Sequence, residues 1–247
     1  MYKRFNDVFK KYKLSFLKRK NVFFGNSFTI ENVYGCKWLI DWTNSVDKNL
    51  AARRHEDDQI LFLLKKIKEI KPTIFIDIGA HGGLYSIIVK KQFPDIEVYS
   101  FEPDKQNRFQ FHANLFLNNL ESKINIFDIG LSNFIGKAPF GIREEFRRGG
   151  KGISKESEEK INVTTLDNIL NLEKKVCFIK NDVEGHEKQV LEGSEDFLKR
   201  NFCYLQTEIL FPNDKESIFD LMKNYNYKYQ LKIDNSNAPD YYFTNIG

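Results

Sequence analysis

From Thr73 onward, short apolar runs alternate with segments of helical character, and this rhythm limits the fold more than any other feature of the chain. The runs predicted as strands are TIFID (73–77), EVYSFE (97–102), INIFD (124–128), VCFIKND (176–182) and FCYLQTE (202–208). The predicted helices occupy 84–92, 105–119, 187–199 and 214–224. Strand–helix–strand repetition at this spacing is typical of right-handed βαβ units in a parallel sheet.

The flanking segments add an antiparallel element and an extension. YKYQLKI and DYYFTNI flank DNSNAP, which predicts a C-terminal hairpin, whereas a polar, Gly- and Arg-rich stretch at 133–162 interrupts the rhythm. Upstream, short strand-like runs fall within 21–50, and an apolar stripe from Leu50 to Ile70 predicts a helix that ends before Pro72. We therefore expect an α/β, Rossmann-like domain over 71–247, mostly parallel, with a helical and strand extension over 1–70 packed on it.

Composition indicates one globular unit. At 247 residues and 41% hydrophobic, the chain can bury one full core. No apolar stretch approaches the roughly 20 residues of a membrane-spanning helix, and charges interrupt every run between Met1 and Lys20. Cys36, Cys177 and Cys203 lack metal-ligand spacing, so we expect reduced thiols. These features predict a soluble, cytoplasmic protein.

The N-terminal 20 residues carry an uneven charge. They hold eight Lys or Arg residues against one acid, Asp7, which gives this segment +7. Aromatic residues at spacings of three and four would make a helix here amphipathic. Such a helix could contact an anionic membrane surface, nucleic acid or a phosphorylated partner. We favour a helix that docks through its aromatic stripe and leaves its lysines in water. The stripe comprises Tyr2, Phe5, Phe9, Tyr12 and Phe16.

A glycine-rich loop follows the first predicted strand of the βαβ region. In FIDIGAHGGLYS (75–86), Gly79, Gly82 and Gly83 stand between that strand and the next helix. Glycine permits close backbone approach and positive φ, and a helix N-terminus offers free N–H groups to a carboxylate or phosphate. A dinucleotide fingerprint, G-x-G-x-x-G, would need glycine where His81 stands. The loop therefore fits a pyrophosphate poorly.

Acidic residues occur at three successive strand ends. Asp77 precedes the loop and suits a cationic cofactor, Glu102 could accept hydrogen bonds from ribose hydroxyls, and Asp128 could accept one from an adenine amino group. Together with the loop they predict an S-adenosylmethionine site. Its expected residues are Asp77, Gly79, Ala80, His81, Gly83, Glu102, Pro103 and Asp128.

Several motifs resemble those of FkbM-type methyltransferases, a class I S-adenosylmethionine-dependent family. They are DIGAHGGLYS, FEP, GLSNFIG, TLD and KNDVEGHEKQVLEG, within about 73–211. The resemblance implies a class I methyltransferase sheet and O-methylation of sugars, glycans or glycosylated natural products. Two positions depart from the family pattern, because His81 replaces the usual Asn and Asn181 a usual Ile.

The DVEGHE segment supplies the candidate catalytic residues. Asp182 ends one predicted strand, Glu184 and His186 follow it, and Glu208 ends the next strand. A positioned base that removes a hydroxyl proton typically contributes ~10²–10⁴-fold. Alternatively, Glu184 and Glu187 could only stabilise the helix N-terminus, and His186 could be a surface histidine. Asp182 and Glu208 could also hold Mg²⁺, but no third ligand is evident, and we favour a metal-free base.

Other basic residues could contribute to binding. Arg143, Arg147 and Arg148 in the polar stretch could bind the diphosphate of a nucleotide-activated sugar, with solvation as the alternative. His81 could act as a base or merely pack, and His55 and Glu56 could close over the cofactor or simply begin a helix.

We therefore expect an O-methyltransferase acting on a nucleotide-activated sugar or a bacterial surface glycan of capsule or lipopolysaccharide type. A nicotinamide-dependent oxidoreductase is the first alternative, and the residue at 81 argues against it. A nucleic-acid-binding protein is the second, and no RNA-binding aromatic motif accompanies the N-terminal lysines. The expected acceptor is a small molecule or glycan, anionic or nucleotide-linked, with no nucleic acid partner. Peripheral membrane contact through the basic segment remains an option, and the sequence does not specify the oligomeric state.

Overall fold

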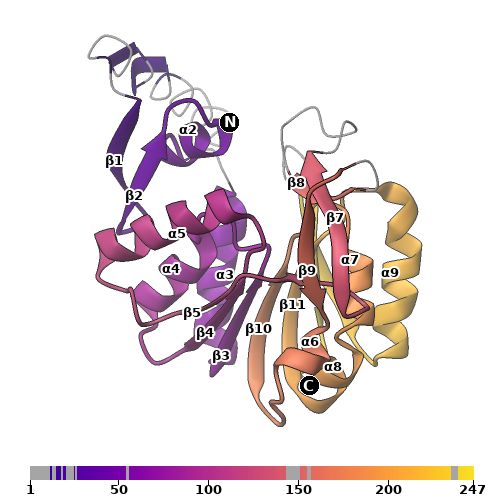
Figure 1. Ribbon diagram of the computed structural model, residues 1–247. Coiled ribbons are helices and arrows are strands. Elements are labelled where there is room, and N and C mark those ends of the chain that lie inside the picture. The colour runs from indigo at the N-terminus through magenta and orange to yellow at the C-terminus, as the bar shows by residue number, and fades with distance from the viewer. Residues whose placement is uncertain are drawn as a thin grey trace.

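The computed structural model describes residues 12, 15–17, 19, 20, 25, 27–53, 56–142, 151–154, 157–234 and 239–247, without the side chains of 212 and 213. Its main feature is a seven-stranded sheet in the order β12-β13-β11-β10-β3-β4-β5 (Figure 1). The strands are β3 (Ile74–Ile78), β4 (Glu97–Phe101), β5 (Asn125–Phe127), β10 (Val176–Asn181), β11 (Phe202–Glu208), β12 (Lys228–Ile233) and β13 (Asp240–Thr244).

The strand directions confirm the predicted α/β class. Neighbours are parallel from β11 to β5, whereas β13 lies antiparallel between β11 and β12. The predicted hairpin is therefore present, and both of its strands extend the sheet. The chain runs outward from β3 through β4 to β5 and then returns to β10 on the other side of β3. The strand order thus reverses between β3 and β10, where open α/β sheets bind ligands.

Helices cover both faces of the sheet. One layer contains α3 (Asp57–Ile70), α4 (Leu84–Gln92) and α5 (Lys105–Asn118). The other contains α6 (Leu166–Ile169), α7 (Glu187–Glu192), α8 (Glu195–Arg200) and α9 (Pro212–Asn224). The period-two alternation of the strands divides the core accordingly, since Phe75 and Phe178 pack with the first layer and Ile76 and Ile179 with the second.

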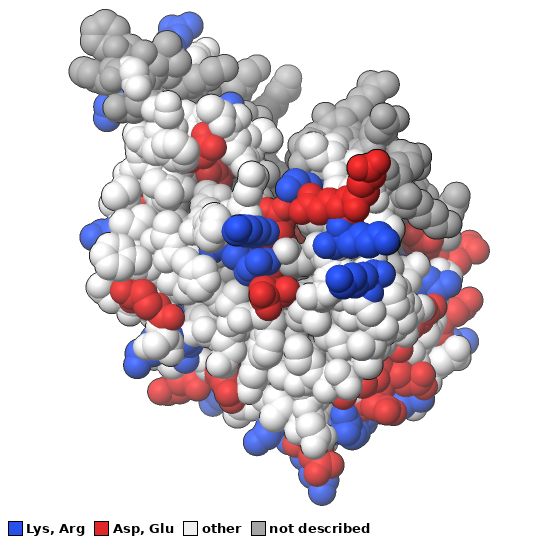
Figure 2. Space-filling view, viewed as in Figure 1, with Lys and Arg blue, Asp and Glu red and all other residues white. Residues whose placement is uncertain are grey.

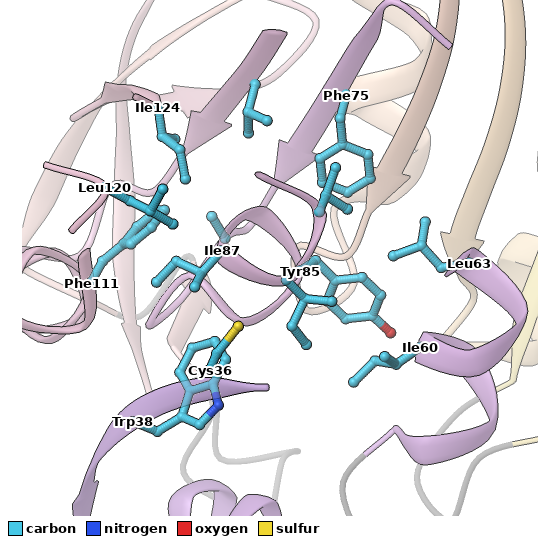
Figure 3. Packing of buried hydrophobic residues seen from close by; sticks show 14 of the residues in the cluster. Cys36, Trp38, Ile60, Leu63, Phe75, Tyr85, Ile87, Phe111, Leu120 and Ile124 are labelled. Carbon is cyan, nitrogen blue, oxygen red and sulfur yellow. The ribbon is translucent and has the colours of Figure 1, made fainter. Parts of the chain in front are cut away.

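The N-terminal extension packs on the first helical layer. Its described part consists of the hairpin β1 (Phe28–Val33) and β2 (Cys36–Asp41), followed by α2 (Ser45–Ala51). Cys36 and Trp38 are buried in the same cluster as Tyr85 and Ile87 of α4 (Figure 3). The extension therefore shares the core of the domain through its second strand.

The polar stretch that interrupts the rhythm contains a second sheet. Strands β6 (Gly130–Leu131), β7 (Gly136–Ile142), β8 (Lys151–Ile153) and β9 (Lys160–Thr164) form it in the order β6-β9-β7-β8. Sequence reasoning treated this stretch as irregular because its charged and glycine residues hide the alternation of short edge strands. Figure 1 shows the N-terminal hairpin and β7–β8 on opposite sides of the main sheet, both toward the top of the view.

One expected helix is divided in two, and another begins later than expected. The segment predicted as one helix over 187–199 forms α7 and α8, whereas the stripe predicted from Leu50 to Ile70 forms α3 only from Asp57 onward, and Leu50 belongs to the separate helix α2. Between α7 and α8, a Cβ on Gly193 would lie 2.0 Å from the carbonyl oxygen of Ser132. The backbone at Ser132 therefore lies directly against Gly193, and this close contact coincides with the break between α7 and α8.

The aromatic stripe of the N-terminal segment is described only at two positions. Tyr12 and Phe16 have 73% and 67% of their surface exposed, so these two residues do not dock on the protein as we expected. The other three lie outside the described residues. No helix within the described ranges is long and apolar enough to cross a membrane.

The contact at Gly193 generates a stability prediction. We expect Gly193→Ala to lower the free energy of unfolding by about 1–3 kcal/mol, because the new methyl group forces the Ser132 backbone away. The backbone at Gly193 has an ordinary φ of −81°, so strain from a left-handed conformation does not contribute. Urea denaturation measures the change. Gly82→Ala is the control, because the nearest atom to its Cβ would belong to Gln110, at 3.5 Å. Equal midpoints for the two variants would contradict the prediction.

Candidate active site

A cavity of about 1180 Å³ lies at the carboxyl ends of β3, β4, β10 and β11. Its walls come from four parts of the chain: these strand ends, the glycine loop, the N-terminal hairpin with α2, and the second sheet. Figure 2 shows the molecule hollowed between the N-terminal part and the second sheet. The volume exceeds the ~300–1,000 Å³ of a typical ligand pocket, so a donor and an acceptor can both be accommodated.

The glycine loop owes two of its glycines to packing inside the protein. A Cβ on Gly79 (φ +80°) would lie 1.8 Å from the carbonyl oxygen of Asp182, and one on Gly83 (φ +83°) would lie 2.2 Å from the ring of Phe111. Gly79 lines the cavity, whereas Gly83 is not among its lining residues. The missing side chains of these glycines therefore face β10 and α5, and of the two only Gly79 presents its backbone to the cavity.

Glu102 connects the glycine loop to the second strand end. Its Oε2 accepts a hydrogen bond from the backbone N–H of His81 at 2.7 Å, and its Oε1 accepts one from the N–H of Asp104 at 2.7 Å. Burial raises the pKa of this carboxyl to about 7, although both N–H donors oppose the shift. A carboxylate has about four lone-pair sites, so it can still accept from a ligand hydroxyl at the cavity wall although the Asn107 side chain also donates to it.

The other residues expected to bind the cofactor divide into two groups. Ala80, His81 and Pro103 line the cavity, and His81 has a left-handed backbone with φ +49°. Asp128 is exposed and is not among the lining residues. It follows β5, which ends at Phe127 on the edge of the sheet, and the structure therefore places it apart from the expected adenine site.

Asp77 is a buried carboxyl that lines the same cavity. Its Oδ2 accepts hydrogen bonds from the N–H and the hydroxyl of Ser86, at 3.1 and 2.5 Å. Its Oδ1 has no hydrogen-bond partner among the described residues. Burial raises the pKa of Asp77, while Lys180 and Ser86 act in the opposite direction. An orphaned acceptor oxygen at the end of the central strand fits a cationic ligand group, and with Glu102 it fits S-adenosylmethionine.

The end of β10 carries an ion pair that sequence reasoning missed. Lys180 is 4% exposed, its Nζ lies 2.7 Å from Oδ2 of Asp182, and the ammonium lies 4.6 Å from the centre of the Tyr85 ring. Burial alone would lower the pKa of Lys180, but the carboxylates of Asp182, Glu56 and Asp77 raise it above its usual value. The lysine therefore stays charged and holds the carboxylate of Asp182 at the cavity wall.

More carboxyl groups surround this pair. Glu208 lines the cavity, and Asp240 is its partner in the register of β11 and β13. Burial, followed by the charges of Asp182 and Asp240, raises the pKa of Glu208 well above its usual range. Asp240 accepts hydrogen bonds from Gln59 and Gln206 at 3.1 and 3.0 Å, and burial raises its pKa to about 7. Glu208 therefore carries a proton at neutral pH and can donate a hydrogen bond.

The DVEGHE segment is held by its last acid. Oε1 of Glu187 accepts hydrogen bonds from the N–H groups of Val183 and Gly185, at 3.0 and 2.9 Å, which agrees with a structural role for Glu187. His186 lines the cavity, and its Nε2 lies 2.9 Å from the hydroxyl of Ser132. Glu184 lines the cavity with a left-handed backbone of φ +56°. The four candidate catalytic residues thus share one cavity.

Other expected contributions are not found or lie outside the described part of the chain. Within the described ranges, no three His, Cys, Asp or Glu side chains gather so that they could hold a metal ion, so a Mg²⁺ site at Asp182 and Glu208 has no structural support. Arg143, Arg147, Arg148 and His55 lie outside the described residues. Glu56 does line the cavity. Its charge acts on Lys180 and on Asp240, so residues from three distant parts of the sequence form one charged cluster there.

The mostly parallel sheet, with a glycine loop and an acid at its first two strand ends, defines a class I methyltransferase fold. The family model described as the Methyltransferase FkbM domain matches residues 77–229, which is more than half of the chain. The chain therefore belongs to the FkbM methyltransferase family, and S-adenosylmethionine is the methyl donor expected for it. This membership supports the methyltransferase prediction over the oxidoreductase alternative. No curated protein matches the chain.

Solved structures share the fold at low identity. Methyltransferase FkbM from Methylobacillus flagellatus KT is 17% identical with a TM-score of 0.53, and the match covers 69% of this chain but only 43% of that one. The human methyltransferase 10 domain containing protein is 10% identical with a TM-score of 0.51, over 85% of this chain and 88% of that one. The Pyrococcus abyssi tRNA (uracil-54, C5)-methyltransferase, in complex with S-adenosyl-L-homocysteine, is 11% identical with a TM-score of 0.50, over 89% and 43%.

The pKa of Glu102 predicts a pH dependence of cofactor binding. Since the ionised carboxylate accepts hydrogen bonds from hydroxyls and the group is half protonated near pH 7, affinity for S-adenosylhomocysteine should rise about tenfold from roughly pH 6 to pH 8. Glu102→Gln should flatten this dependence and weaken binding by about 1–3 kcal/mol. Calorimetry at each pH measures both effects. Asp128→Asn is the control and should change neither, and an unaltered pH profile in Glu102→Gln would contradict the assignment.

Proposed function

We propose that the protein transfers the methyl group of S-adenosylmethionine to a hydroxyl of a sugar, in a nucleotide-activated sugar or a surface glycan of capsule or lipopolysaccharide type. The observation that carries this proposal is the Lys180–Asp182 ion pair at the cavity wall, 2.7 Å long. It supplies an ionised carboxylate next to the glycine loop, because the Asp182 backbone touches the position where Gly79 lacks a side chain. A hydroxyl needs such an acceptor for its proton, whereas a more nucleophilic sulfur or amine needs it less.

Bound S-adenosylmethionine supplies an electrophilic methyl group on a sulfonium. Asp182 accepts the proton of the acceptor hydroxyl, and Lys180 stabilises the carboxylate until the proton arrives. Protonated Glu208 donates a hydrogen bond to a neighbouring sugar oxygen. His186 contributes a further polar contact from its position beside Ser132. Positioning of the two reactants by these groups can supply ~7–11 kcal/mol of the barrier reduction.

The charge of the cavity bears on the acceptor. Its two described lysines are both paired with acids inside the cavity, Lys151 with Asp104 at 2.6 Å and Lys180 with Asp182. Within the described lining, therefore, the hydroxyl-rich part of an acceptor finds hydrogen-bond partners more readily than a phosphate does. If the acceptor is nucleotide-linked, its diphosphate would contact the Arg143, Arg147 and Arg148 segment.

A direct assay tests this function. The purified protein is incubated with S-adenosylmethionine and panels of nucleotide sugars and surface glycans, and products are analysed by mass spectrometry and NMR for a methyl ether. Methylation of a sugar oxygen is the expected result. Methyl transfer only to nitrogen, carbon or nucleic acid would overturn the proposal for the acceptor while leaving the family assignment intact.

The ion pair predicts the behaviour of two variants. Asp182→Asn should lower kcat by about 10²–10⁴-fold, the usual contribution of a placed base, with the affinity for S-adenosylhomocysteine retained. Lys180→Met should also lower kcat, but by less, because Asp182 loses the ion-pair partner that holds its carboxylate in place.

Rate profiles for wild type and both variants, measured with and without EDTA, test this assignment. Lys180→Arg is the matched control and should keep most of the wild-type kcat, because it retains a cation beside Asp182. Full activity in Asp182→Asn would reject Asp182 as the base. Loss of turnover in EDTA with rescue by Mg²⁺ would show that a metal ion is required after all.

A further inference from the structure

The outer edge of β2 is bound by side chains of α5 instead of another strand. On one edge β2 pairs with β1. On the other, three amide side chains spaced four residues apart on α5 contact the backbone of β2, and spacing by four places them on one face of the helix. They are Gln110, Asn114 and Asn118.

Each amide has a definite set of bonds. Asn118 accepts from the N–H of Lys37 at 3.0 Å and donates to its carbonyl at 2.7 Å. Asn114 accepts from the N–H of Leu39 at 2.8 Å, and Gln110 donates to the Leu39 carbonyl at 3.1 Å. A backbone edge that would be open to water or another chain is thereby satisfied by the helix.

Asn114 differs from Asn118 because it also binds the glycine loop. Its Nδ2 donates to the carbonyl oxygen of Gly82 at 2.9 Å, and the side chain is 2% exposed. One buried amide therefore connects the loop after β3 to the hairpin strand β2. Gln110 extends the connection to α2 by donating to Oδ2 of Asp47 at 2.7 Å.

The parts joined in this way are walls of the same cavity. Leu39, Asp47, Gly82, Gln110 and Asn114 all line it, whereas Lys37 and Asn118 are not among the lining residues. The hairpin and α2 precede residue 77, where the match to the family domain begins. The N-terminal extension therefore contributes cavity wall that lies outside the matched family domain.

We propose that Asn114 is a positioning residue that couples the glycine loop to the N-terminal hairpin, so that donor binding sets the position of the cavity wall formed by the hairpin and α2. The inference rests on the proposed function, since it assigns the glycine loop to the methyl donor. A bound donor fixes the position of the Gly82 carbonyl. Asn114 hydrogen-bonds both this carbonyl and the Leu39 N–H, and Gln110 hydrogen-bonds both the Leu39 carbonyl and Asp47 of α2, so the two amides carry the change from the loop to the wall.

Paired variants test the coupling. Asn118→Ala removes both bonds to Lys37 and a further bond to the Asn114 carbonyl, so it loosens the same strand without touching the loop. We expect Asn114→Ala to weaken S-adenosylhomocysteine binding about tenfold, within the usual range of coupling energies. Asn118→Ala should leave this affinity unchanged. Both variants should lower the melting temperature. Calorimetry and thermal denaturation measure these quantities. In wild type, adding S-adenosylhomocysteine should slow hydrogen exchange in 36–51, and this protection should disappear in Asn114→Ala only.

A second variant covers the case in which Asn114→Ala does not fold. Asn114→Asp keeps an acceptor for Leu39 but has no donor for Gly82, so it should lose affinity and the exchange protection with β2 still in place. If both Asn114 variants bind the ligand as tightly as Asn118→Ala and retain protection in 36–51, the coupling is refuted. Failure of the wild-type protein to bind S-adenosylhomocysteine would instead overturn the proposed donor site and, with it, this inference.

Discussion

A single buried ammonium holds the acidic end of the sheet together. Lys180 faces Asp182 at 2.7 Å and the Tyr85 ring at 4.6 Å, and the carboxylates of Glu56 and Asp77 also raise its pKa. Removing one partner from a buried pair typically costs 3–5 kcal/mol because the other charge is left uncompensated. Without this lysine, the buried carboxyl group of Asp77 and the carboxylate of Asp182 would lose their cationic partner at the ends of β3 and β10.

The same end of the sheet depends on two close backbone contacts. At Gly79, the loop that follows β3 lies against the backbone carbonyl of Asp182, which follows β10. At Gly193, the break after α7 lies against the backbone carbonyl of Ser132, which follows β6. The first contact places Asp182 beside the glycine loop, and the second holds the Ser132 segment, whose hydroxyl contacts His186. These glycines of the motif therefore act first through packing, which positions the polar groups of the cavity.

How far sequence predicts such a site depends on the range of the interactions. Alternation along the chain located the central strands within one or two residues, and Glu102 and Asp182 follow from strand ends because parallel strands end at one edge. Asp128 failed the same reasoning, since β5 is a short edge strand and Asp128, the residue that follows it, is exposed. Glu56 and Asp240 are 184 residues apart in sequence and lie near Lys180 only through the fold. Sequence reasoning named Glu56 as a candidate, but no local pattern could predict that it shares a cluster with Asp240. The second sheet and the late start of α3 were hidden in the same way.

The cavity combines two structural origins. Its floor, formed by the strand ends and the glycine loop, belongs to the matched family domain, whereas one wall is the hairpin outside it. The opposite wall is the small sheet, pinned by the bond from Lys151 to Asp104, which also caps α5 through the N–H groups of Gln106 and Asn107. Helix α5 therefore contacts both walls, at its N-terminus through Asp104 and along its length through Gln110 and Asn114. Because α5 also packs on the sheet, it fixes both walls relative to the floor formed by the strand ends and the glycine loop.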